Sequence, residues 1–156
     1  MSAHGFLLLI AALWLAGAAQ AQPLAVQESA GTRFVSGGVG EEERAQLAAT
    51  RAGFNLHLTF AVARSGNYLA DVRVALRDAS GREMLAANAE GPWLLAQLAP
   101  GRYSLTAEYG GKVQTRTVAV PRAGRAEVFL YWDDPAALEG RGMEPERERK
   151  PPPRRR

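Results

Sequence analysis

The chain has 156 residues, of which 47% are hydrophobic and 22% are charged, and its formal net charge is +3. It contains no cysteine, which excludes disulfides, thiolate metal sites, a cysteine nucleophile and a lipid-modified N-terminal cysteine. Of its two histidines, only His57 lies outside the first 21 residues. Little hydrolytic or metal-dependent chemistry can be built from this inventory. We therefore expect a protein that is not an enzyme and that holds no cofactor and no metal.

Residues 1–21 have the pattern of a secretory signal peptide. An uncharged apolar run covers residues 6–19 and is shorter than the ~20 residues that a membrane-spanning helix needs. Small residues on either side of Gln20 predict cleavage after Ala21. Because residues 1–5 contain neither lysine nor arginine, an uncleaved anchor is the alternative. The chain contains 17 arginines and only 2 lysines, a ratio that is typical of proteins from GC-rich bacterial genomes. We expect a mature chain without a transmembrane segment, located in the periplasm or, alternatively, secreted.

The first part of the mature chain is expected to be a loose leader, residues 22–39, followed by a short helix over residues 40–52. Gly40 is placed to cap the helix, and three glutamates at 41–43 fill its first turn, where negative charge suits the helix dipole. The glycine-rich stretch 36–40 exposes N–H groups that an anion could use. Since the glutamates occupy that place, a capping role is favoured.

From residue 54 the period of apolar residues changes to 2, which indicates β-strands. Strands are expected over 54–62, 72–77, 84–87, 93–98, 103–109 and 112–120, and in a final segment that ends at residue 132. Val113 is out of phase with Val118 and Val120, so a bulge or a register shift is expected in the sixth strand. Turn signals separate the strands at about 8–12-residue spacing. This pattern favours an all-β sandwich over residues 53–132.

Residues 133–156 are expected to form a disordered tail. They contain five prolines and few large apolar side chains, so they cannot bury enough surface to become ordered. The tail ends in Arg154, Arg155 and Arg156, which favour weak contact with anionic lipid or cell-wall polymers; a purely solubilising tail is the alternative. Residues 22–132 carry 12 basic and 10 acidic side chains, and this near-neutral balance argues against nucleic-acid binding.

Two short motifs resemble a known family. A D-x-x-G turn lies at 78–81, and residues 98–103 read L-x-P-G-x-Y before a strand of alternating apolar residues. Over about residues 54–132 this pattern resembles the carboxypeptidase regulatory-like domains. The resemblance implies a seven-stranded prealbumin-like (transthyretin-like) β-sandwich, in which Tyr103 enters the core beside the Pro100-Gly101 turn. The segment 34–41 also resembles small exported bacterial proteins of unassigned role that bear this domain.

Tyr68, Trp93 and Tyr131 are the candidate contact residues in the folded domain, together with Arg154, Arg155 and Arg156 of the tail. Exposed rings at the edge of a sandwich can stack on sugar rings or seat a partner's apolar residue.

Other aromatic and polar residues receive structural interpretations. Trp132 is in phase with the core residues of the last strand, whereas Phe129 and Tyr131 fall on its other face. We expect the N-terminal helix to cover that face, because its Leu47 must pack somewhere. His57 is expected on the outward face of the first predicted strand as a solvated surface residue. Asp78 fits a turn acceptor.

The preferred functional prediction is a protein-interaction or structural module in the cell envelope, which joins partners through sheet faces or an edge strand. The alternative is a module that binds a cell-wall glycan or exopolysaccharide with exposed aromatic residues. Glycan binding requires two or more rings exposed on one face, whereas an interaction module requires an apolar patch or an unblocked strand edge. An enzyme would require a cleft with convergent polar groups around His57.

Overall fold

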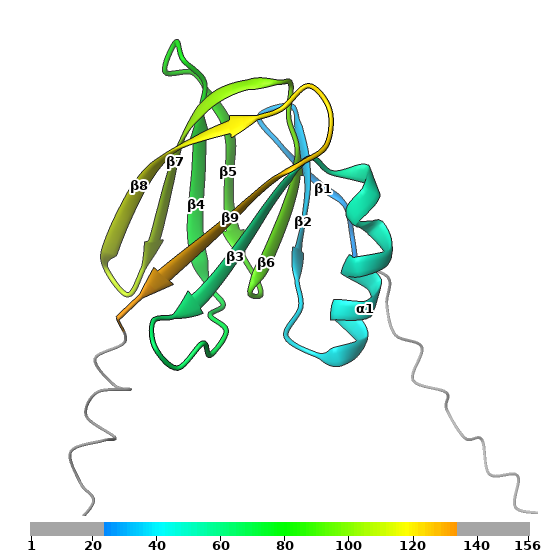
Figure 1. Ribbon diagram of the computed structural model, residues 1–156, viewed down its shortest axis with the longest axis vertical. Helices are drawn as coiled ribbons and strands as arrows, with labels where there is room; N and C mark the ends of the chain where they lie inside the picture. Colours follow the sequence, from blue (N-terminus) through cyan, green and yellow to red (C-terminus); the bar gives the residue numbers. More distant parts are fainter. Residues whose placement is uncertain (1–23, 134–156) are drawn as a thin grey trace, which may run out of the picture.

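A computed structural model describes residues 24–133, which form two β-sheets packed face to face and one helix (Figure 1). The predicted signal peptide and the tail beyond residue 133 lie outside the described residues. The strands are β1 (Gln27–Ser29), β2 (Thr32–Gly37), β3 (Leu56–Val62), β4 (Val72–Arg77), β5 (Glu83–Ala89), β6 (Trp93–Gln97), β7 (Gly101–Tyr109), β8 (Lys112–Val120) and β9 (Ala126–Trp132). The first sheet has the order β1-β2-β6-β3-β9 and the second has the order β5-β4-β7-β8. The expected all-β architecture with one helix is confirmed.

Within the described residues there are nine strands, two more than predicted. The prediction of a loose leader over residues 22–39 is wrong, because β1 and β2 form a hairpin and β2 pairs with β6 inside the first sheet. Phe34 belongs to the core between the sheets, whereas Val35 packs on the opposite face. A strand that is buried on both faces does not alternate between polar and apolar residues, so its period is not visible in the sequence.

The seven predicted strands are all present, and their ends differ from the predicted ones by at most two residues. The prediction of a bulge or register shift near Val113 is wrong, since β7 and β8 pair without interruption from Gly101 opposite Val120 to Tyr109 opposite Lys112. Val113 simply lies on the outer face of β8, where it is exposed. A register shift occurs instead in the pairing of β4 with β5, between residues 76 and 77.

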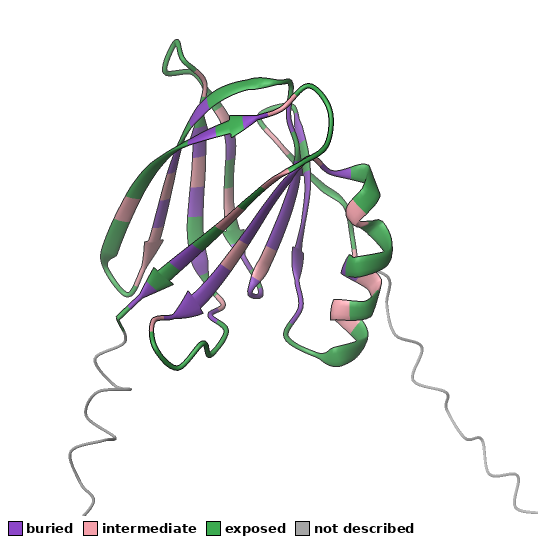
Figure 2. Ribbon diagram, viewed as in Figure 1, coloured by how far each residue is buried: buried purple, intermediate pink, exposed green. Residues whose placement is uncertain are grey.

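The main core lies between the two sheets and is built from the inward residues of both. Its fully buried large side chains are Phe60, Leu56, Leu58, Leu76, Leu85, Leu94, Leu105 and Leu130. Trp132 is buried as predicted, and its ring packs against Phe60 and Tyr109 at centroid distances of 6.3 and 6.1 Å. Figure 2 shows long buried stretches on β3 and β6, whereas most of the helix is exposed.

The helix α1 (Glu41–Thr50) begins after Gly40, as predicted, and continues into the 3₁₀ turn η1 (Arg51–Gly53). The carboxylate of Glu43 accepts hydrogen bonds from the backbone N–H groups of Gly38 and Val39, at 2.9 and 3.1 Å. A side chain of this protein therefore satisfies two N–H groups of the glycine-rich turn. Glu43 thus has the capping role predicted for the glutamates at this turn.

The helix packs on the outer face of the first sheet through one apolar residue. Leu47 is fully buried and meets Val35 of β2, Leu95 of β6 and Phe54. Figure 1 shows α1 beside β1 and β2, at the side of the sheet opposite β9. Since the helix covers only this part of the face, the part formed by β3 and β9 remains open.

Candidate functional site

A groove of about 440 Å³ lies on the open part of the outer face of the first sheet. Strand β3 pairs in parallel with β9 and antiparallel with β6, so outward residues of the three strands stand side by side in rows. The rows contain Leu95, His57 and Glu127, then Trp93, Thr59 and Phe129, then Ala61 and Tyr131. The groove therefore changes from polar residues at one end to aromatic residues at the other.

Four aromatic side chains line one end of the groove, namely Tyr68, Trp93, Phe129 and Tyr131. Tyr68 reaches the groove from the loop after β3, where its backbone bridges to Ala61, and its ring meets the ring of Trp93 edge-on at a centroid distance of 6.4 Å. Tyr68, Phe129 and Tyr131 are 54%, 48% and 50% exposed, and Trp93 is half-buried. The three aromatic residues predicted from the sequence thus lie in one groove.

The prediction that α1 covers the outward aromatic residues of β9 is wrong. The helix lies over β2 and β6, so the rings of Phe129 and Tyr131 stay accessible to solvent. The sequence places Phe129 on this face but does not single it out as a contact residue. The predicted contacts Arg154, Arg155 and Arg156 lie outside the described residues.

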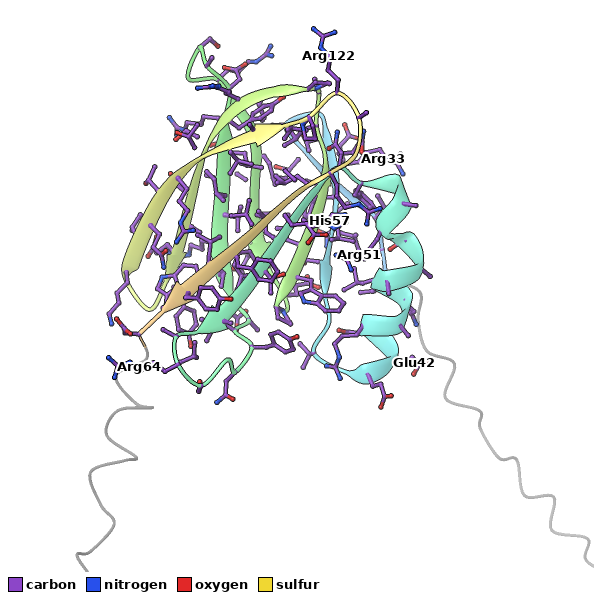
Figure 3. All side chains as sticks on the ribbon, viewed as in Figure 1. Arg33, Glu42, Arg51, His57, Arg64 and Arg122 are labelled. Carbon is purple, nitrogen blue, oxygen red and sulfur yellow. The ribbon has the colours of Figure 1, made fainter. Side chains whose placement is uncertain are left out.

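His57 lies on the outward face of β3, as predicted, but only 4% of it is exposed, so the prediction of a solvated histidine is wrong. Arg51 covers it, with Nε and Nη2 at 3.3 and 3.2 Å from His57 Nδ1. Because a guanidinium can only donate, Nδ1 must accept, and the ring proton is therefore on Nε2, 3.3 Å from the carbonyl oxygen of Phe54. The imidazole is neutral, and both of its nitrogens are hydrogen-bonded. Figure 3 shows Arg51 and His57 next to each other between the sheet and the helix.

Burial lowers the pKa of His57 below its ordinary value of 6.5, and the positive charges of Arg51 and Arg125 lower it further. Arg51 Nη2 also donates to Glu127 Oε1 at 3.1 Å, and that oxygen lies 3.8 Å from His57 Nδ1. The side chains of Arg51 and Glu127 are partly exposed. They form the polar end of the groove. His57 Nδ1 accepts hydrogen bonds from Arg51 and so fixes the position of its guanidinium.

No sequence motif connects Arg51 with Glu127, which are 76 positions apart. Their contact depends on the parallel pairing that places Glu127 of β9 beside His57 of β3. The turn η1 then brings Arg51 over the same row. Neither Arg51 nor Glu127 was among the predicted contact residues, because neither the pairing of distant strands nor the position of the turn is visible in local sequence patterns.

Side chains cap parts of two strand edges of the sandwich, those of β9 and β5. Along β9, the carbonyl oxygens of Phe129 and Tyr131 accept hydrogen bonds from Arg116 and Gln114 of β8, at 3.3 and 2.7 Å. Across the molecule, the β1 hydroxyl of Ser29 donates to the carbonyl oxygen of a β5 residue, Ala86, at 2.8 Å and accepts from its N–H at 3.1 Å. These contacts use backbone groups that an added strand would need.

Among residues 24–133, no group of three or more acidic or histidine side chains is arranged to hold a metal ion. In the same part of the chain, no helix is long and apolar enough to cross a membrane. The groove offers ring surfaces for apolar contact with a ligand. At its polar end, Arg51 provides hydrogen-bond donors and Glu127 provides acceptors.

This protein is a two-sheet β-sandwich with an aromatic-lined groove on the outer face of one sheet. Comparisons with protein-family models and with curated proteins found no match for this chain. Its function must therefore be argued from its own residues.

Proposed function

We propose that this protein is a carbohydrate-binding module and that the groove on the outer face of the first sheet is its binding site. The observation that carries the proposal is the convergence of Tyr68, Trp93, Phe129 and Tyr131 on one face, beside the Arg51–Glu127 pair. A sugar ring has an apolar face of C–H groups that packs on aromatic rings, and hydroxyl groups around its rim that hydrogen-bond to charged planar side chains. Binding sites of this kind combine apolar walls with a few placed polar groups.

Two observations favour glycan binding over the predicted interaction module: Tyr68, Phe129 and Tyr131 are exposed on one face, and the edge of β9 is partly capped. An interaction through an edge strand needs free backbone N–H and carbonyl groups, and the carbonyl groups of Phe129 and Tyr131 are already used. The environment of His57 also supports a non-enzymatic role. A general base must reach a substrate proton, whereas His57 is buried and its Nδ1 faces Arg51.

The proposal also includes the family of the sandwich and the cellular compartment of the protein. We propose a prealbumin-like sandwich of the carboxypeptidase regulatory-like type, because both motifs have the structural parts that the resemblance implies. Asp78 Oδ1 accepts hydrogen bonds from the N–H groups of Ser80 and Arg82, and buried Tyr103 donates its hydroxyl proton to the carbonyl of Ala99 at 2.7 Å. An exported, periplasmic location would place the groove beside cell-wall glycans and exopolysaccharides.

The proposal is tested by screening the purified protein on a printed glycan array and then measuring affinity for the strongest ligand by isothermal titration calorimetry. We expect Tyr68→Ala and Tyr131→Ala each to weaken binding about two- to tenfold, since an aromatic contact contributes about 0.5–1.5 kcal/mol. Val113→Ala is the matched control, because it removes an exposed apolar side chain outside the groove. An array without bound glycans, or tyrosine variants that bind like the wild type, would contradict the proposal.

A further inference from the structure

A second hollow, of about 350 Å³, lies on the same face beyond the polar end of the groove. The backbone pairing continues here by one step, since Ala126 N–H donates to the carbonyl of Asn55 and Asn55 N–H donates to the carbonyl of Ala96. Asn55, Arg125 and Gln97 therefore form the row that follows His57, Glu127 and Leu95. The second hollow therefore begins one row beyond the polar end of the groove.

The second hollow carries the unbalanced positive charge of this surface. Arg122 and Arg125 both line it, and neither has a carboxylate within ion-pair distance among residues 24–133. In the groove, by contrast, Glu127 neutralises Arg51. Figure 3 shows Arg122 at the upper end of the molecule, far from Arg64 at the lower end.

The polar groups left for a ligand in this hollow are mainly cationic. The side chain of Asn55 is used internally, because its Nδ2 donates to the carbonyl of Leu98 and its Oδ1 accepts from the N–H of Leu98, at 2.7 and 2.9 Å. The guanidinium groups of Arg122 and Arg125 can each form charge-assisted hydrogen bonds in pairs with a carboxylate.

One extended ligand can reach both the rings and the arginines. Phe129 and Tyr131 lie four and six residues from Arg125 along the strand direction of β9, which corresponds to about 13 and 20 Å at ~3.3 Å per residue. A ligand of this length is an oligosaccharide rather than a single sugar, and the arginines select for negative charge on it.

We infer that the ligand is an acidic glycan, whose sugar rings pack on Tyr68, Trp93 and Tyr131 while its carboxylates bind Arg122 and Arg125. This inference rests on the proposed function and specifies its substrate class. The groove supplies the contacts that any glycan would use, and the second hollow supplies the preference for uronic acids over neutral sugars.

The test uses matched ligands on the same array, namely uronic-acid oligosaccharides and their methyl esters, which differ only in charge. We expect the acids to bind and their esters to bind at least tenfold more weakly. In calorimetry, Arg122→Gln/Arg125→Gln is expected to lose at least tenfold in affinity for the acid and to leave the affinity for the ester unchanged. For the wild type, 0.5 M salt is expected to reduce the difference between acid and ester, because it screens exposed charges.

Arg73→Gln/Arg102→Gln is the control for net charge, since it removes two exposed arginines, one of them paired with Glu108, from the outer face of the second sheet. An equal loss in this control would mean that only net charge matters, and it would overturn the inference. Esters that bind as tightly as acids, with Tyr131→Ala still weakening both, would also overturn it and leave the proposed function standing. If no glycan binds, the proposed function fails and the inference fails with it.

Discussion

His57 shows how a single polar side chain can be buried on the outer face of a sheet. A buried polar group without a partner costs about 1–3 kcal/mol, but both nitrogens of His57 are hydrogen-bonded, to Arg51 and to the carbonyl of Phe54. Throughout the described residues, every buried side-chain nitrogen and oxygen has a partner. The histidine is thus a positioning residue for Arg51.

This arrangement predicts a pH-dependent stability. The folded pKa of His57 lies below 6.5, so the unfolded chain takes up the proton first as the pH falls. The contribution of neutral His57 to the free energy of unfolding is complete above about pH 6.5 and is lost as the pH falls through the folded pKa. Protonated Nδ1 can no longer accept from Arg51, and Arg125 adds repulsion, while exposed Glu127 at 3.8 Å offsets only part of this.

Urea unfolding at several pH values between 7.5 and 5 measures the effect. We expect the midpoint of the wild type to fall more than that of His57→Gln, which cannot titrate in this range. Other groups titrate equally in both proteins, so the difference between the two curves reports on His57. Parallel curves for the two proteins over this range would contradict the prediction.

Among the elements, helix α1 decides where the groove lies. It has one fully buried apolar residue, Leu47, and it therefore covers only the part of the sheet near β2 and β6. A wider apolar stripe would have covered more of the face, including the rings of β9. The narrow contact of the helix leaves four aromatic residues accessible to a ligand.

The edge formed by β8 and β9 yields a prediction about self-association. Gln114 and Arg116 donate to the carbonyl groups of β9, so Gln114→Ala/Arg116→Ala frees these carbonyls for strand pairing between molecules. We expect a larger fraction of dimers and higher oligomers, measured by size-exclusion chromatography with light scattering over a concentration series. The control variant Thr115→Ala/Thr117→Ala changes the opposite face of β8, and we expect it to self-associate no more than the wild type. Equal association of both double variants would show that the caps do not protect the edge.

At the scale of the whole molecule, Trp132 joins the end of β9, the last strand of the described residues, to the core between the sheets. Its ring packs on Phe60 and Tyr109, and its indole N–H donates to the carbonyl of Lys112 at 3.1 Å. This contact holds β9 against β8, where the two sheets approach each other. The same strand carries the outward rings of the groove, so the core anchors the binding surface.

We expect Trp132→Ala to lower the free energy of unfolding by about 3–5 kcal/mol, a large share of the ~5–15 kcal/mol typical of a domain. Trp93→Ala is expected to cost clearly less, because Trp93 is half-buried on the outer face, and to weaken glycan binding instead. Urea unfolding followed by circular dichroism measures both. Similar stability losses in the two variants would contradict this division between a core tryptophan and a groove tryptophan.

The sequence by itself determined the structural features that depend only on residues close together in the chain. The period of 2 predicted seven strands and placed Trp132 inside and Phe129 outside, and Gly40 with the glutamates at 41–43 predicted the start of the helix. These features are local, because side-chain alternation and capping involve residues only a few positions apart.

Only the tertiary structure decided which of these elements meet. Strand β2 carries no alternation because it is buried on both faces, and the Arg51–Glu127 contact joins positions 76 residues apart through the parallel pairing of β3 with β9. Whether α1 covers the rings of β9 depends on where Leu47 finds a partner on the sheet. Such pairings are selected by burial over the whole chain, and for that reason no local pattern in the sequence specifies them.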